Sequence, residues 1–187
     1  FSTDGGTIKL DGNYPTGTEN TALGDTALDS VQAGGNYNVV LGSRAGTNIT
    51  TGDNNVGVGA YALCDIQTNS QNVAIGTESL KKNTASNNTA VGYISLRCNT
   101  SGADNTSVGL CSLTANTTAS NNVAVGSAAL RLNTTGANNV SVGRQALCSN
   151  TTATCNTGIG DRTLCANTTG SENTAVGSFA LCTNTTG

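Results

Sequence analysis

The chain has 187 residues, a formal net charge of −3, 10% charged residues, 3% aromatic residues, and no His, Met or Trp. It has too few large apolar residues for an ordinary globular core, and too little charge and proline for a typical disordered chain. The low charge argues against nucleic-acid binding, the lack of a long apolar run argues against membrane insertion, and the lack of His excludes His-based triads and most zinc sites.

The first 19 residues lie outside the repeat that fills the rest of the chain. We interpret residues 1–19 as an N-terminal cap or junction segment. Within it, the stretch from Thr7 to Leu10 is predicted to form a strand that caps or extends the first repeat.

From Asn20 to Gly187 a unit of about 17 residues occurs ten times, and each unit holds an Asn, a strand-like triplet and a Gly. We number the units by these repeat glycines, which are Gly24, Gly42, Gly59, Gly76, Gly92, Gly109, Gly126, Gly143, Gly160 and Gly177. The asparagine stands four residues earlier, at Asn20, Asn38, Asn55, Asn72, Asn88, Asn105, Asn122, Asn139, Asn156 and Asn173. A leucine stands four residues after the glycine in every unit except the second, which has Gly46.

Within the triplet, a β-branched or large apolar residue alternates with a tiny one, and this period of two predicts a strand. A unit of this length cannot bury its own apolar face, whereas stacked units can. The sequence therefore predicts an all-β fold, a parallel β-solenoid of about ten rungs over residues 20–187, forming a rod roughly 45–50 Å long.

The constant positions have predicted structural roles. We expect the Val, Ile or Leu before the glycine and the Leu after it to fill a thin interior. Stacked asparagines are expected to form an amide ladder, and the glycine a backbone conformation that is closed to other residues.

Two phrases, Asn72-Val73-Ala74-Ile75-Gly76 and Asn122-Val123-Ala124-Val125-Gly126, resemble the head repeats of trimeric autotransporter adhesins (YadA-like heads). They also resemble repeats in phage and giant-virus fibre proteins, and the resemblance covers nearly all of the chain after Asn20. It implies a left-handed parallel β-roll, often trimeric, that serves as a surface adhesin or a fibre shaft. The chain departs from the adhesin pattern in its longer repeat and its seven cysteines.

Four cysteines, Cys64, Cys148, Cys165 and Cys182, fall five residues after a repeat glycine, and the last three would stack on successive rungs. At about 5 Å apart they lie within the range of a disulfide. The odd total leaves at least one thiol free or paired between chains. One interpretation is covalent reinforcement in an oxidising, extracellular place, and the other is reduced cysteines that act as small apolar fillers.

Asparagine also begins an Asn-x-Ser/Thr sequence at ten sites, which predicts glycosylation on exposed turns. The alternative is that Asn and Thr simply favour turns. Six of the sites share one repeat position, Asn99, Asn116, Asn133, Asn150, Asn167 and Asn184, and the other four are Asn48, Asn87, Asn105 and Asn139.

Candidate chemistry is sparse elsewhere. The stretch Gly57 to Ala62 fits a dinucleotide-binding pattern but is one copy of the repeat, so no cofactor, metal or catalytic site is predicted. Stacked threonine pairs, such as Thr117-Thr118 and Thr134-Thr135, raise the alternative of ice binding, although neighbouring residues of a strand point to opposite faces.

The sequence thus predicts a non-enzymatic structural subunit of an extracellular, cell-surface or virion-surface fibre that can carry glycans. Because the repeat runs to Gly187 without a polar cap, we expect head-to-tail stacking at exposed strand edges. The expected partner is the chain itself, as a homo-polymer or homotrimer. The alternatives are a trimeric adhesin head that binds a host receptor or cell-surface glycans, or an ice-binding solenoid.

Overall fold

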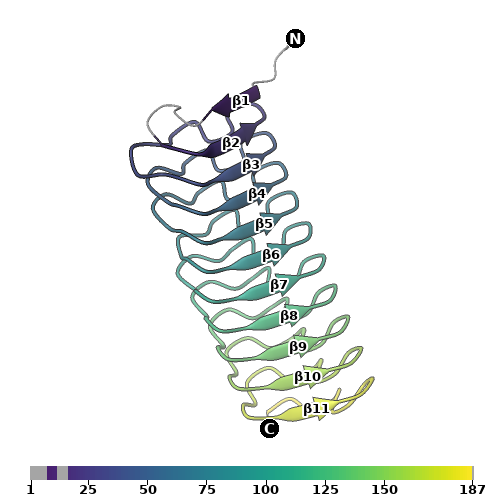
Figure 1. Cartoon of the computed structure of the whole chain (residues 1–187). Coiled ribbons are helices and arrows are strands. Elements are labelled where there is room, and N and C mark those ends of the chain that lie inside the picture. The colour runs from purple at the N-terminus through teal and green to yellow at the C-terminus, as the bar shows by residue number, and fades with distance from the viewer. Residues whose placement is uncertain (1–7, 12–16, 187) are drawn as a thin grey trace.

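The computed structural model describes residues 8–11 and 17–186, and this part of the chain is all β, with no helix (Figure 1). Ten short strands lie one per rung. Their bounds are β2 Asn20–Leu23, β3 Val39–Leu41, β4 Val56–Val58, β5 Val73–Ile75, β6 Thr89–Val91, β7 Thr106–Val108, β8 Val123–Val125, β9 Val140–Val142, β10 Thr157–Ile159 and β11 Thr174–Val176.

These ten strands form one parallel sheet in chain order, which confirms the predicted β-solenoid. Every pair aligns equal positions of the repeat; Ala74, for example, lies opposite Ala90. The sixteen- to eighteen-residue separation of hydrogen-bonded partners is one turn of the solenoid. Each strand therefore contacts only the strands of the rungs before and after it.

A further strand, β1 (Ile8–Asp11), pairs antiparallel with β2 and covers the free edge of the first rung. The predicted strand is thus present from Ile8, whereas Thr7 lies outside the described residues. An antiparallel strand at this place interrupts the parallel register of the sheet, so the first rung ends in a different hydrogen-bond pattern from all the others.

The turns of each rung depend on positive backbone φ angles. The ten repeat glycines have φ between 123° and 139°, a region that side chains exclude, as predicted. The positions five before, two after and four after the glycine lie in the left-handed region as well, and most of them are not glycine. Such a residue costs about 1–2 kcal/mol, which the hydrogen bonds from neighbouring rungs must offset.

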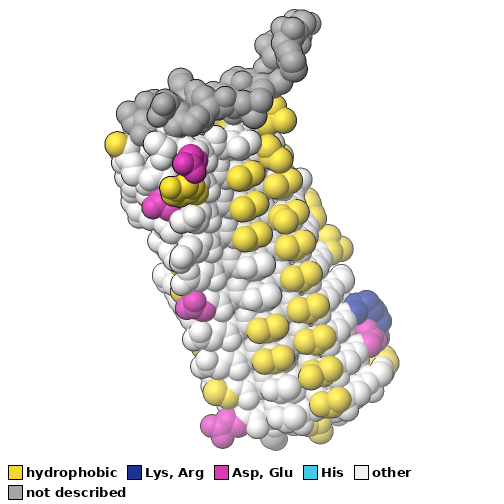
Figure 2. All heavy atoms as spheres, viewed as in Figure 1, with side chains coloured by type: hydrophobic (Ala, Val, Ile, Leu, Met, Phe, Trp, Pro, Cys, Tyr) yellow, Lys and Arg dark blue, Asp and Glu magenta, His cyan; other side chains and the backbone are white. Residues whose placement is uncertain are grey.

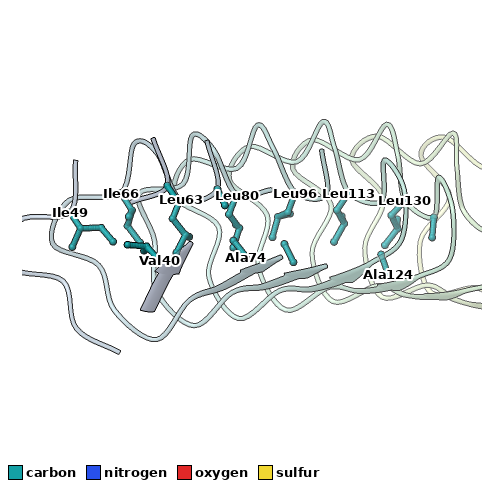
Figure 3. Packing of buried hydrophobic residues seen from close by; sticks show 14 of the residues in the cluster. Val40, Ile49, Leu63, Ile66, Ala74, Leu80, Leu96, Leu113, Ala124 and Leu130 are labelled. Carbon is teal, nitrogen blue, oxygen red and sulfur yellow. The ribbon is translucent and has the colours of Figure 1, made fainter. Parts of the chain in front are cut away.

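The interior is a narrow column of leucines from successive rungs, shown in Figure 3. Leu80, Leu96, Leu113 and Leu130 are each fully buried, so the prediction for this leucine is confirmed. Small side chains from the middle of each strand, such as Ala74 and Ala124, pack against them.

The residue before each glycine does not lie in this interior, and the prediction that it fills the core was wrong. In β5, for example, Ala74 is buried while Val73 is partly exposed and Ile75 is exposed. The reason is steric: the leucines already occupy the narrow interior, so only the tiny middle residue of the triplet fits inside. The alternation predicts the strand correctly, but the two faces of that strand are exchanged.

The predicted asparagine ladder is present and buried. Asn105 is typical: its backbone N–H and its side-chain amide both donate to Oδ1 of Asn88, at 3.0 and 3.1 Å. The same amide donates to the carbonyl of Ala119 at 2.9 Å. A buried polar group is tolerated only when it is hydrogen-bonded, and this ladder satisfies its members from rung to rung.

A second asparagine ladder runs through the interior seven residues after the repeat glycine. Its amides donate to Oδ1 of the rung before, for instance from Asn116 to Asn99 at 2.8 Å and from Asn133 to Asn116 at 3.0 Å. In the first three rungs this position holds Val31, Ile49 and Ile66, all buried. At this one repeat position the interior therefore changes from apolar side chains to amides at the fourth rung, where Asn83 begins the ladder, while the leucine column continues.

Candidate interaction surface

The first and last residues of the strand triplets point outward and form two columns, which we call the strand face. One column is Thr21, Val39, Val56, Val73, Thr89, Thr106, Val123, Val140, Thr157 and Thr174. The other, directly before the glycines, is Leu23, Leu41, Val58, Ile75, Val91, Val108, Val125, Val142, Ile159 and Val176. Figure 2 shows both columns over the strands, with the second unbroken along the rod.

This face exposes large apolar side chains in a row. Leu23, Ile75, Val125 and Ile159 are each 36–43% exposed, and Val176 on the last strand is 67% exposed. With ten rungs about 4.8 Å apart and two side chains across, the strand face covers roughly 450 Å². Five of its twenty side chains are threonines, and the apolar remainder is comparable to the largest apolar patch on a typical monomer, which is often functional.

Acidic side chains line the edge of the sheet at which the strands begin. Glu19, Asp53, Asp104 and Glu172 lie five or six residues before a repeat glycine, and Figure 2 shows separate acidic groups along this edge. We call it the strand-start edge. No Lys or Arg side chain that the structure describes lies on it, so it carries a charge of −4.

Basic side chains gather on the opposite side, on the wall that follows the repeat glycine. All the Lys and Arg side chains that the structure describes lie one to six residues after a glycine, namely Arg44, Lys81, Lys82, Arg97, Arg131, Arg144 and Arg162. Five acids share this post-glycine wall, Asp25, Asp29, Asp65, Glu78 and Asp161, which leaves a net charge of +2. The strand face therefore has an acidic border on one side and, on the other, a border of mixed charge with a small positive excess.

Two arginines at the same repeat position each stack on an aromatic ring of the following rung. The guanidinium of Arg44 lies 5.5 Å from the ring centre of Tyr61, and that of Arg162 lies 5.7 Å from Phe179. Arg162 also donates to Oε1 of Gln145 at 3.0 Å. These contacts hold two cations along the wall, one near each end of the rod.

An ion-pair group occupies the middle of the wall. Glu78 accepts from Lys81 at 2.8 Å and from Arg97 at 3.3 Å, and Lys81 also lies 4.8 Å from the ring centre of Tyr61. The hydrogen bond from Lys81 lowers the pKa of Glu78, and the same bond raises the pKa of Lys81. Arg144 and Asp161 form a separate pair at 2.9 Å. Pairs this exposed contribute little to stability.

The seven cysteines are all free thiols, so the predicted disulfide is not formed. Cys148, Cys165 and Cys182 do form a column, but each sulfur points along the rod: Sγ of Cys148 lies 3.5 Å from the carbonyl oxygen of Cys165, and Sγ of Cys165 lies 3.4 Å from that of Cys182. Equal positions on successive rungs have parallel Cα–Cβ bonds about 4.8 Å apart, whereas a disulfide needs bonds that converge to about 3.8 Å.

Burial explains the chemistry of this column. It is the main cause of the raised pKa of the Cys165 thiol, to which the neighbouring Cys148 and Cys182 add. The pKa of Cys64 is also raised, first by burial and then by Asp65. Both thiols are therefore protonated and weakly reactive near neutral pH. Six of the cysteines are half-buried and Cys155 is exposed, so none of them is a fully buried apolar filler.

The predicted glycosylation sites are mostly interior. Asn99, Asn105, Asn116, Asn133, Asn139, Asn150 and Asn167 are 0–1% exposed, and their amides belong to the two ladders. Asn87 is exposed, and Asn48 and Asn184 are half-buried. A glycan on a ladder amide would replace a hydrogen bond between rungs, so the folded chain favours Asn87 as the acceptor.

The sequence could have shown the second ladder. Its position holds Asn in seven rungs and Val or Ile in three, and an asparagine that exchanges with large apolar residues at one repeat position points to the interior.

The first threonine of each stacked pair is hydrogen-bonded to the next rung. Thr117 donates its hydroxyl to the carbonyl of Thr134 at 3.1 Å, and Thr134 donates to Thr151 at 3.0 Å. The same bond recurs at Thr50, Thr84, Thr100, Thr151 and Thr168. Only the second threonine of each pair is left for solvent, so the two flat ranks of free hydroxyls that ice binding would use are not formed.

Other kinds of site are not found in the part of the chain that the structure describes. No group of three or more Cys, Asp or Glu side chains there is arranged to hold a metal ion, and no helix there has the length and apolar character to cross a membrane. The strand face is therefore the best candidate for a functional surface. Comparisons with protein-family models, curated proteins and solved structures find no match to this chain, so the resemblance to adhesin heads and viral fibres stays a prediction.

Proposed function

We propose that this chain is a structural subunit of a fibre on a cell or virion surface and is not an enzyme. The observation that carries the proposal is the direction of the hydrogen bonds within the chain. Both asparagine ladders, the threonine hydroxyls and the sheet hydrogen bonds all run along the rod axis from one rung to the next. A molecule whose interior polar groups are used in this way is built to be stiff along one direction.

The repeat also supports stacking of subunits along the axis. Each strand offers the next one the same donors and acceptors, so β11 presents to a following strand the pattern that β10 presents to β11. At the other end, β1 covers the first rung and runs antiparallel to β2, so a stacked subunit would pair β11 with the outer edge of β1 as an antiparallel pair, unlike the pairs within the rod. The N-terminal segment then forms the junction between subunits.

A trimeric adhesin head is the second candidate, and the apolar strand face favours it. A free rod would leave this face in water, whereas three rods around one axis would bury it. A surface location rests on the resemblance to adhesins and fibres, because the free thiols give no support for an oxidising compartment.

Electron microscopy of the purified full chain, with sedimentation velocity on the same sample, tests the proposal. We expect filaments with a regular axial repeat, unchanged by reductant because no disulfide holds them together. Short particles three rods wide would favour the adhesin head. A monodisperse monomer at high concentration would reject self-assembly, and with it both candidates.

A further inference from the structure

We propose that a second copy of this chain covers the strand face and runs parallel to the first, with the strand-start edge of one copy against the post-glycine wall of the next. The inference rests on the proposed self-assembly and adds the direction and the partner edges of the lateral contact. Four observations carry it: the apolar face, its limited area, the separated charges and the heights of those charges along the rod.

The area of the strand face shows that its two borders belong to the interface. A stable contact between proteins usually buries about 800 Å² on each partner. The strand face offers roughly 450 Å², about half of this amount. A second copy that covers the face must therefore extend over the flanking edges, and the charges there decide which edge meets which.

The charges favour unlike edges in contact. The strand-start edge carries only acids among the described residues, whereas the post-glycine wall carries all the described cations together with five acids and has a net charge of +2. If a twofold axis parallel to the strands joined two antiparallel rods, it would place each strand-start edge against its own copy, acid against acid. Parallel rods bring the strand-start edge of one copy to the wall of the next, so opposite charges meet.

The heights of the charges agree with rods in register. Arg44 lies on the second rung, next to the heights of Glu19 and Asp53 on the first and third rungs. Arg162 lies on the ninth rung, one rung from Glu172 on the tenth. One rung is about 4.8 Å, within the reach of an arginine side chain. The two stacked arginines would therefore hold the neighbouring acidic edge near both ends of the rod.

Within the described part of the chain, no ion pair involves Arg44, Arg162, Glu19 or Glu172. The arginines are already held by rings, so less side-chain entropy is lost when they bind an acid. Charges of opposite sign that are in no ion pair among the described residues thus stand within one rung of each other on the two edges that parallel packing joins.

Charge-reversal variants test which two edges are in contact. The full-length double variant Arg44→Glu/Arg162→Glu is expected to weaken lateral association about tenfold or more at low salt. Adding Glu19→Arg and Glu172→Arg to the same chain should restore it. Glutamate suits the new backbone positions, since Glu78 occupies the same repeat position with φ 57°. Arg131→Glu, farther along the wall from the strand face, is the matched control and should leave association unchanged.

Cysteine cross-linking tests the direction. In a Cys111→Ser/Cys155→Ser background, which removes the native thiols nearest to these positions on the wall and on the edge, Asn121→Cys places a thiol on the strand-start edge, and Ser127→Cys places one just after the glycine of the same rung. Cys155 itself shows that the first position accepts cysteine, with φ 58°. Parallel rods in register should give disulfide dimers in a mixture of the two variants and none in either variant alone.

The outcomes separate this inference from the proposed function. Dimers formed by either variant alone, no cross-link in a laterally associated sample, or association that ignores charge reversal would overturn the parallel packing while leaving self-assembly intact. Filaments only one rod wide would also overturn it. A chain that stays monomeric throughout would reject the proposed function as well.

Discussion

At the residue scale, the spacing between rungs depends on glycine. A Cβ built on Gly109 would lie 2.5 Å from the carbonyl oxygen and 2.6 Å from the carbonyl carbon of Gly126, the repeat glycine of the next rung. Both contacts are with backbone, which cannot move without shifting a whole rung. The glycine therefore has two separate roles: it allows φ near 139°, and it lets two rungs approach.

The substitution Gly109→Ala should be severely destabilising, by about 4 kcal/mol or more, because strain and a backbone clash act together. Gly177→Ala is the matched control. Its φ of 123° is similar, but nothing lies within 4 Å of the added Cβ, so it should cost only the conformational strain of about 1–3 kcal/mol. Chemical denaturation of both variants checks this; equal losses would show that rung contact adds nothing.

The sequence predicted these glycines and the first asparagine ladder, because ten copies of one position leave few structural alternatives. It did not predict which side of the strand faces inward. Alternation shows that the two faces differ, but it does not say whether the side of Ile75 or the side of Ala74 is inside, and the usual preference for large residues inside led to the wrong choice. What decided it was the width of the interior, which Leu80 and its equivalents already fill, so that Ala74 is buried and Ile75 is exposed.

At the element scale, each rung is held to the next by its two buried asparagines. Asn116 in the second ladder donates to Oδ1 of Asn99 at 2.8 Å and to the carbonyl of Ala119 at 3.0 Å, and its own Oδ1 accepts from Asn133 at 3.0 Å. A break in the middle of this ladder leaves partners unsatisfied on both sides, because water cannot reach them.

The substitution Asn116→Ile should therefore cost about 2–4 kcal/mol, since it leaves the buried Oδ1 of Asn99 without its donor and the buried amide of Asn133 without one acceptor. Size is not the cause, because Ile66 fills the same repeat position in the third rung with full burial. Asn121→Asp, at an exposed strand start where Asp104 of the preceding rung takes nearly the same φ, is the control and should change stability by less than about 0.5 kcal/mol. If both variants unfolded at the same denaturant concentration, the ladder would have no stabilising role.

The second ladder also shows why the site was harder to predict than the fold. An Asn-Thr-Thr stretch has the composition of a turn and of a glycosylation site, so local chemistry pointed to the surface. Its true place depends on how deeply the turn folds back over the interior. That depth is a property of the closed rung, which no stretch of a few residues specifies.

At the scale of the whole molecule, the rod has no contacts between distant rungs, since each described strand pairs only with its neighbours in the chain. Stability should then be a sum of rung terms and nearest-neighbour terms. This differs from a globular core, in which residues far apart in sequence pack together. The buried leucines allow a direct test, because Leu113, Leu130 and Leu164 lie on the sixth, seventh and ninth rungs.

Each single substitution of these leucines by alanine should cost about 2–5 kcal/mol. Leu113→Ala with Leu130→Ala should depart from additivity by about 0.5–3 kcal/mol, because the two cavities adjoin and the rungs around them relax together. Leu113→Ala with Leu164→Ala, three rungs apart, should be additive within about 0.5 kcal/mol. Unfolding by denaturant measures the coupling in both double-mutant cycles, with sulfate present to stabilise the folded state of the variants. Strong coupling between the distant pair would mean that strain travels along the rod, and the nearest-neighbour description would then fail.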